Sequence, residues 1–392
     1  MKETITKTET GKIILMSPSQ FSAKEQKWCQ QSTIYKRSKS LYRLQTQIGH
    51  GSYSIVHVGF HELTKEKVAI KTCNKQTLTP RAKKMLLREI AIMETVFHPN
   101  IVRLYEVLET PTKLHLVMEY MSGGGLHTRL LSEGKMKESD AKIIFAQLLS
   151  AVKHLHERNI IHRDIKAENV FCGEKNHVKL GDFGFSTVLV KGSNEELFTL
   201  CGSLPYAAPE LLQERRYQGQ PVDIWALGVL LYFITTGQMP FSAISVAHLK
   251  RSILLGVIPM PAHLSHSCIT LIRGMLRSTP SKRFTLPEVR NSLWMSDIMI
   301  SENTYDRWCI IPTLDRDEKL AEIEIKARKQ LLAYGIDDKM LEEHALKGIK
   351  SDVIATYRII IHKLLTSNHI PAVTRITAKK LNHARSHLCV IT

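Results

Sequence analysis

The sequence predicts an α+β protein in which a small β-rich part precedes a larger helical part. Short apolar runs alternate with polar residues over residues 42–112, which is typical of strands, and one helical pattern beginning near Pro80 interrupts them. Helical periodicity dominates residues 114–294. After a connector, three short helices are predicted within residues 319–365. These patterns indicate two main folded parts and a small third one.

The third part is predicted from its capping residues and its apolar spacing. Gly335 is placed to end the first helix, and Ser351 is placed to cap the last. A short helix around Met340 lies between them. Apolar residues at helical spacing form one face on each longer helix: Leu320, Ile323, Ala327 and Leu331 on the first, and Val353, Tyr357, Ile360 and Leu364 on the last.

The chain carries an excess of positive charge that is concentrated at its ends. Its 392 residues include 54 Lys and Arg against 37 Asp and Glu, a net charge of +17, and 43% of them are hydrophobic, as in globular proteins. We therefore expect a flexible basic leader over 1–41, a linker over 297–318 and a basic tail over 367–392. Charge alone suggests nucleic-acid binding, but no zinc-finger or RRM pattern supports it, so no nucleic-acid partner is expected.

The seven cysteines are scattered, and no two of them form a CxxC pair. This argues against a zinc site or a disulfide framework and for a reducing compartment. The first residues contain no apolar signal segment, and no run approaches the roughly 20 apolar residues of a membrane span. We therefore expect a cytoplasmic location.

A glycine-rich segment lies between the first two predicted strands. Glycine lets the main chain approach phosphate groups closely, so this segment is a candidate flap over a nucleotide. On its own, the segment is better interpreted as an ordinary hairpin turn, because such turns are common and a serine replaces the third glycine. The segment consists of Ile48, Gly49, His50, Gly51, Ser52, Tyr53, Ser54, Ile55 and Val56.

Four further motifs follow this segment in a fixed order. The strand Val-Ala-Ile-Lys ends at Lys71, for which Glu89 in the next helix is the candidate partner. His-Arg-Asp-Ile-Lys-Ala-Glu-Asn then spans residues 162–169, Asp-Phe-Gly spans 182–184 and Ala-Pro-Glu spans 208–210. Each motif alone is a plausible accident, whereas the ordered set is not.

This ordered set resembles the eukaryotic protein-kinase family over residues 42–296. The strings HPNIVRLYEV, CGSLPYAAPE and DIWALGV are similar to AMP-activated-kinase-related Ser/Thr kinases, and KAENVF and GDFGFSTV to the branch called new-inducer-of-mitosis-like kinases. The resemblance implies a bilobal kinase fold with an N-lobe over 42–117, a C-lobe over 118–296, and ATP and Mg²⁺ as cofactors. It also implies that residues 319–366 form a ubiquitin-associated-like (UBA-like) segment that packs on the kinase, with ubiquitin binding as the less favoured role.

The resemblance assigns a role to each matching residue. Lys71 would grip the α- and β-phosphates, with Glu89 orienting it, and Asp164 would accept the proton of the attacking hydroxyl. Lys166 would lie beside the γ-phosphate. Asn169 and Asp182 would hold Mg²⁺. The adenine would be enclosed by Ile48, Val56, Ala69 and Phe171, and it would form hydrogen bonds with Glu119 and Met121.

The resemblance also implies two structural anchors. One is an ion pair between Glu210 and Arg283, and the other is Asp223, which would support the catalytic loop.

A regulatory site is expected between the Asp-Phe-Gly and Ala-Pro-Glu motifs. Thr199 lies there, and Arg163 is placed to bind a phosphate on it through charge-assisted hydrogen bonds. The resemblance implies an upstream kinase of the liver-kinase-B type. The alternative is an unmodified loop threonine.

Two departures from the family pattern concern the choice of protein substrate. Gly125 and Phe233 stand where kinases that select arginine commonly carry acidic residues, and Glu168 is one acidic residue that remains. We therefore expect a weaker demand for arginine just upstream of the phosphorylated residue.

The last four residues, from Cys389, form a C-a-a-X pattern. Two interpretations are open. In the first, Cys389 is prenylated, which beside the basic tail would support membrane association. In the second, Cys389 is unmodified, because the final threonine is atypical for prenylation.

For the whole chain, the alternative to an active kinase is a catalytically silent nucleotide-binding scaffold, which the presence of Asp164, Asn169 and Asp182 disfavours.

Overall fold

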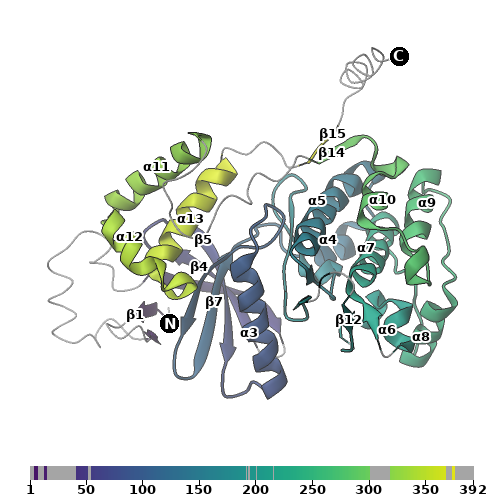
Figure 1. The fold of residues 1–392 in the computed structure, drawn as a ribbon, viewed down its shortest axis with the longest axis horizontal. Helices are drawn as coiled ribbons and strands as arrows, with labels where there is room; N and C mark the ends of the chain where they lie inside the picture. The colour runs from purple at the N-terminus through teal and green to yellow at the C-terminus, as the bar shows by residue number, and fades with distance from the viewer. Residues whose placement is uncertain are drawn as a thin grey trace, which may run out of the picture. The chain divides into compact units, whose positions relative to one another are not determined.

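The computed structural model describes residues 4–7, 13–15, 41–51, 54–190, 192, 195–199, 201–214, 216–300, 318–367 and 373–375. The chain divides into two compact units. The first comprises Met1–Glu94, Val102–Tyr120 and Asp306–Ile370, and the second comprises Thr95–Ile101, Met121–Tyr305 and Pro371–Thr392. The first unit holds the main sheet and the second most of the helices, so the predicted order of a β-rich part and a helical part is confirmed (Figure 1).

The first unit is built on one antiparallel sheet, with the strand order β2-β1-β3-β4-β5-β7-β6. Its central strands are rich in valine, isoleucine and leucine, which pack well on a pleated surface. The strands are β1 (Thr4–Lys7), β2 (Ile13–Leu15), β3 (Tyr42–Gly51), β4 (Ser54–His61), β5 (Lys67–Asn74), β6 (Leu104–Glu109) and β7 (Lys113–Glu119).

One face of this sheet carries Lys71. Val56 pairs with Lys71, and Val58 pairs with Ala69, so these four side chains point to the same face because partners and alternate residues share a side. Helix α3 (Pro80–Thr95) lies on this face, since its Glu89 bonds Lys71. The helix begins at a proline, which is favoured in a first turn, and it ends before the His-Pro-Asn segment.

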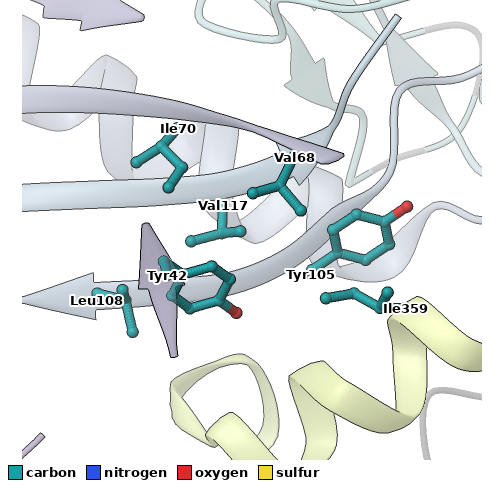
Figure 2. Close-up of a cluster of buried hydrophobic side chains, with 7 residues drawn as sticks. All are labelled: Tyr42, Val68, Ile70, Tyr105, Leu108, Val117 and Ile359. Carbon is teal, nitrogen blue, oxygen red and sulfur yellow. The ribbon is translucent and has the colours of Figure 1, made fainter. Parts of the chain in front are cut away.

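The opposite face of the sheet is covered by helix α13 (Asp352–Ser367). Ile359 of this helix joins a buried cluster with strand residues, as Figure 2 shows. The cluster consists of Tyr42, Val68, Ile70, Tyr105, Leu108, Val117 and Ile359. The third predicted part therefore belongs to the same compact unit as the sheet.

The three C-terminal helices are α11 (Glu318–Ala333), α12 (Asp338–Ala345) and α13. Gly335 follows α11 with a φ of 84°, a conformation that glycine adopts without strain, and Ser351 accepts a hydrogen bond from the main chain of Ile354 at the start of α13. The predicted single apolar face of α13 was too narrow. Residues 353–361 are all buried, because α13 contacts α11 as well as the sheet.

The second unit is mainly helical. Its helices are α4 (Leu126–Glu133), α5 (Glu138–Glu157), α6 (Pro209–Gln213), α7 (Gly219–Thr236), α8 (Val246–Leu255), α9 (His266–Met275) and α10 (Leu286–Arg290). Its short strands are β8 (Ile160–Ile161), β9 (Val170–Cys172), β10 (Val178–Leu180), β11 (Thr187–Val188), β12 (Glu196–Leu197), β13 (Tyr217–Gln218), β14 (Ile298–Ile300) and β15 (Val373–Arg375). Over the described residues, no helix combines the length and the apolar character that crossing a membrane requires.

Helix α7 lies at the centre of the second unit and is buried along nearly its whole length. Trp225 of this helix stacks on Phe241 with ring centroids 5.7 Å apart. The guanidinium of Arg283 lies 5.1 Å from the Trp225 ring centroid and donates to both carboxylate oxygens of Glu210, at 2.7 and 2.9 Å. The Glu210–Arg283 pair thus ties the segment after the Ala-Pro-Glu motif to the core.

Candidate active site

In the first unit, the lysine of the Val-Ala-Ile-Lys strand is held by the glutamate of helix α3. The Nζ atom of Lys71 lies 2.7 Å from Oε1 and 2.9 Å from Oε2 of Glu89. The Glu89 side chain is 5% exposed and that of Lys71 is 19% exposed. A buried carboxylate that meets an ammonium group at both oxygens fixes where the ammonium points. Lys71 is therefore set in one orientation on the face of the sheet that α3 covers.

The glycine-rich segment forms the hairpin between β3 and β4. Gly49 pairs with Val56, His50 with Ile55 and Gly51 with Ser54. A Cβ atom at position 51 would lie 3.0 Å from the Ser54 hydroxyl, so the hairpin is tight at the point where serine replaces the third glycine. Ser52 and Tyr53 lie outside the described residues.

The remaining residues assigned to the adenine are distributed over both units. In the first unit, Ala69 is buried in β5, Ile48 is half exposed in β3, and Glu119 is the last residue of β7. In the second unit, Phe171 in β9 bridges Gly125. The N–H of Gly123 donates to the Cys172 carbonyl, and the N–H of Cys172 donates to the Gly124 carbonyl, which fixes the segment that follows Met121.

The second unit presents Asp164 in a network of donors. Its Oδ1 accepts from the main-chain N–H of Ser203 at 2.9 Å and from the Ser203 hydroxyl at 3.0 Å. Its Oδ2 lies 2.8 Å from Nζ of Lys166 and accepts from the Asn169 amide at 3.0 Å. The orientation of the Asp164 carboxylate is therefore fixed by three neighbouring residues. A substrate hydroxyl that gives its proton to Asp164 has to displace one of these donors.

Asn169 and Asp182 lie at the two ends of a short main-chain link. The N–H of Gly181 donates to the carbonyl of Asn169 at 2.9 Å, and Asp182 follows Gly181 with a φ of 58° and an exposed side chain. The Asn169 amide nitrogen donates to Asp164, which leaves its amide oxygen as the atom that a cation would meet. A carboxylate and an amide oxygen are hard ligands of the kind that Mg²⁺ prefers, so these residues fit that ion.

Asp223 anchors the loop that carries Asp164. Its carboxylate accepts hydrogen bonds from the main-chain N–H groups of His162, at 3.0 Å, and Arg163, at 2.8 Å. The Nε2 atom of His156 lies 2.8 Å from the same carboxylate. Burial alone would raise the pKa of Asp223, but these hydrogen bonds bring it below its ordinary value. The charged carboxylate is thus the stable form, and it holds Arg163 at a φ of 64°.

Comparison with known proteins agrees with this arrangement. The sequence model of the protein kinase domain family matches residues 42–295, which is more than half of the chain. The chain belongs to the protein kinase family. A curated relative of this kinase chain is "Serine/threonine-protein kinase SIK3 homolog" of Danio rerio, to which it is 41% identical over 330 residues. That alignment covers 82% of this chain and 27% of the relative, so the chain spans about a quarter of the relative's length.

The relative is an AMP-activated-kinase-related protein, which confirms the group predicted for the kinase. The narrower new-inducer-of-mitosis-like branch stays a prediction. Cys389 and the residues of the basic tail from 376 onward lie outside the described residues, so the expected lipidation has no structural counterpart here.

Thr199, the threonine expected to be regulatory, contacts the arginine expected to bind a phosphate on it. Arg163 donates to the Thr199 hydroxyl at 2.7 Å, and the Tyr217 hydroxyl donates to the Thr199 carbonyl at 2.7 Å. Arg163 also donates to the carbonyl of Phe185, close after the Asp-Phe-Gly motif. The loop is therefore tied at Thr199 before any modification, with a guanidinium beside the hydroxyl.

The residues expected to bear on substrate choice form a small group. The ring centroids of His127 and Phe233 are 6.0 Å apart, and His127 Nε2 lies 4.0 Å from Oε1 of Glu168. The side chains of His127 and Glu168 are 36% and 46% exposed. Glu168, the acidic residue that remains, thus has the His127 imidazole as its neighbour. The Phe233 ring lies at the position where kinases that select arginine commonly carry an acidic residue.

Two residues at the site were missed from the sequence. Ser203 contacts the Asp164 carboxylate, whereas the string CGSLPYAAPE, in which it lies, indicates the family and assigns Ser203 no role. His362 bonds Glu119 from helix α13, and its helical spacing beside apolar residues carried no signal for this contact. The resemblance itself could have pointed to Ser203; only the packing of α13 reveals His362.

Proposed function

We propose that this chain is an active Ser/Thr protein kinase that transfers the γ-phosphate of ATP to hydroxyl groups of proteins. The observation that carries the proposal is the environment of Asp164, whose carboxylate lies beside the Lys166 ammonium and is oriented by Asn169 and Ser203. A carboxylate so placed accepts a proton from a hydroxyl, and the neighbouring ammonium offsets negative charge on a phosphoryl group. The Ser/Thr assignment follows the relative, which is named a serine/threonine-protein kinase, and Lys166, which marks this class in the resemblance.

The residues of each unit have separate tasks in this reaction. Lys71, fixed by Glu89, binds phosphate oxygens in the first unit, and the main chain of Gly49 and Gly51 covers them. Asn169 and Asp182 would hold Mg²⁺ in the second unit. Bound Mg-ATP supplies the transferable phosphoryl group and the cation that neutralises its charge. Asp164 takes the proton of the attacking hydroxyl.

We also propose that phosphorylation of Thr199 by a kinase of the liver-kinase-B type activates the chain. The contact between Arg163 and the Thr199 hydroxyl supports this, because a phosphate there would receive stronger charge-assisted hydrogen bonds from the same guanidinium. Arg163 adjoins Asp164, so the loop and the catalytic carboxylate would be stabilised together.

The preferred protein substrates are proposed to lack a strict arginine requirement. An arginine side chain losing water needs carboxylates, and Gly125 and Phe233 provide none. The Glu168 carboxylate would have to interact with both the arginine and His127, whose Nε2 lies 4.0 Å from it. The His127 ring is partly exposed beside the buried Phe233 ring and neither offers a carboxylate, so a residue other than arginine upstream of the phosphorylated hydroxyl fits this group better.

A cytoplasmic location is proposed from the cysteines. Cys73, Cys172 and Cys268 are buried and form no disulfide within the described residues, which is typical of a reducing compartment. Membrane association through Cys389 rests on the sequence and stays a prediction.

One assay on an unbiased Ser/Thr peptide library tests the proposed function. The wild-type chain, pretreated with a liver-kinase-B-type kinase, should phosphorylate peptides, and Asp182→Asn should lower the rate by at least about a hundredfold, since a neutral amide replaces the charged carboxylate that would hold Mg²⁺. Thr199→Ala should lower activity strongly in matched preparations. The peptide profile should show little selection for arginine upstream.

Three outcomes would count against the proposals separately. No transfer by the wild type beyond the Asp182→Asn level would favour the silent nucleotide-binding scaffold. Equal activity of Thr199→Ala would remove the activating phosphorylation. A profile dominated by upstream arginine would contradict the assignment of the His127–Phe233 group.

A further inference from the structure

Helix α13 makes a polar contact with the strand end that is assigned to the adenine. The His362 Nε2 atom lies 2.9 Å from Oε1 of Glu119, the last residue of β7. The His362 side chain is 15% exposed and that of Glu119 is 11% exposed, so water has little access to the pair. Because a carboxylate oxygen accepts, Nε2 is the nitrogen that carries the donated proton.

Two other contacts define where this pair lies. The main-chain N–H of Arg103 donates to the second carboxylate oxygen of Glu119 at 3.3 Å, and the N–H of Glu119 donates to the Arg103 carbonyl at 2.9 Å. The His362 ring meets the Tyr105 ring edge-on, with centroids 5.9 Å apart. The Glu119 carboxylate is therefore held between the start of β6 and helix α13.

The neighbouring contacts of α13 position His362 itself. Arg358, one turn earlier, donates to the Tyr105 carbonyl at 3.1 Å, and Ile359 lies in the buried cluster beneath the helix (Figure 2). Lys363 pairs with Glu66 at 2.5 Å on the more exposed side. The helix is thus docked by several independent groups, and the loss of the His362 bond alone does not release it.

We propose that His362 is a positioning residue for nucleotide binding: by fixing the Glu119 carboxylate, it sets the orientation of the strand end that meets the adenine. The inference rests on the proposed kinase function. Since the Glu119 side chain is engaged on both oxygens, its main chain is the part expected to meet the nucleotide. A partly buried carboxylate that loses its donor turns toward other donors or water, and the main chain to which it is attached shifts with it.

The experiment compares three variants of the full chain. His362→Phe keeps a ring against Tyr105 but cannot donate, His362→Gln keeps a donor near the Nε2 position, and Lys363→Ala removes the neighbouring ion pair of the same helix. The measurements are KM for ATP, KM for peptide, kcat, the Kd of ATP by calorimetry and the unfolding midpoint.

His362→Phe should raise KM and Kd for ATP about tenfold, which corresponds to the loss of one charge-assisted hydrogen bond. Its peptide KM and its kcat at saturating ATP should stay within about twofold of wild type, because the groups around Asp164 are untouched. His362→Gln should recover most of the ATP affinity. Lys363→Ala should resemble wild type in every measurement.

Several results would overturn the inference. One is an unchanged Kd of ATP in His362→Phe. Another is a loss in His362→Phe that Lys363→Ala reproduces, or that extends equally to peptide KM, since both would indicate general loosening of α13. If the wild type binds ATP without transferring phosphate, the proposed function fails while the Kd values still decide the role of His362. A wild type that binds no ATP would overturn both.

Discussion

At the scale of single residues, Gly202 is the position where the main chain leaves least room beside the catalytic loop. Its φ is 96°, and a Cβ atom there would lie 2.6 Å from the carbonyl oxygen of Arg163. Ser203, which donates twice to Asp164, follows directly. Gly202→Ala should therefore push Ser203 or the catalytic loop aside and lower kcat by at least about tenfold, the effect of disturbing one catalytic contact.

Gly134→Ala is the matched control for this change. Gly134 also has a positive φ, 77°, but a Cβ atom there meets nothing within 4 Å, and the residue ends helix α4 rather than adjoining Asp164. It should cost about 1 kcal/mol of stability from strain and leave kcat close to wild type. Peptide phosphorylation at saturating ATP, measured beside the unfolding midpoint, separates the two effects. Equal kcat values for the two variants would argue against the clash with Arg163.

Sequence motifs assign roles to single residues where the chemistry demands a fixed residue type. Lys71, Asp164 and Asn169 could be assigned because a resemblance ties each to one motif and one role. Ser203 and His362 could not be assigned in this way. Their contacts depend on how distant segments pack, and many residue types at those positions are compatible with the same local structure.

At the scale of elements, helix α13 is the structural link between the C-terminal segment and the sheet. Ile359 is 2% exposed and lies among strand residues. Ile359→Ala should lower the stability of the first unit by about 2–4 kcal/mol, because the removed methyl groups leave a cavity that the sheet cannot close. Hydrogen exchange of strands β5 to β7 and of α13 measures this loss within the first unit.

Leu346→Ala provides the corresponding exposed substitution. Leu346 is 97% exposed after helix α12, so its truncation should change stability by less than about 0.5 kcal/mol. If Ile359→Ala exchanged no faster than Leu346→Ala, the docking of α13 on the sheet would be in doubt. Faster exchange in both α13 and β7 would support the intramolecular role of the UBA-like segment.

Helix α13 itself was predictable, but its partners were not. Apolar spacing revealed one stripe on this helix, through Val353, Tyr357 and Ile360, and predicted a helix of nearly the right extent. The second contact surface includes Thr356, Arg358 and His362, whose polar types indicate a solvent-exposed face. They are covered because the sheet supplies matching groups: His61 for Thr356 and the Tyr105 carbonyl for Arg358.

At the scale of the whole molecule, buried histidines occur in both compact units. His61 lies in β4, with its ring nitrogens 3.0 Å from the Thr64 hydroxyl and 3.3 Å from the Thr356 hydroxyl. Burial lowers the pKa of His61 to about 3, and the pKa values of His115 and His154 to about 4. These rings are therefore folded in their neutral form, although in an unfolded chain they would bind protons near pH 6.5.

The consequence is a loss of stability in mild acid. A histidine whose folded pKa is lowered contributes stability that is complete above about pH 6.5 and is lost as the pH falls toward the folded pKa. Each such histidine removes up to about 1.4 kcal/mol per pH unit, or roughly 2 kcal/mol between pH 7.5 and pH 5. The unfolding midpoint should therefore fall steeply over this range, as followed by calorimetry at constant ionic strength.

His61→Gln tests which groups cause the loss. The variant has no ring to protonate at this position, so the first unit should lose roughly 2 kcal/mol less than wild type between pH 7.5 and pH 5, whatever its stability at neutral pH. His266→Gln, at an exposed position at the start of α9, should follow the wild-type curve. A flat midpoint across this range in the wild type would contradict the neutral burial of these rings. A His61→Gln curve parallel to wild type would place the proton uptake on other groups, because any group that binds more protons in the unfolded chain than in the fold makes stability fall with the pH in this way.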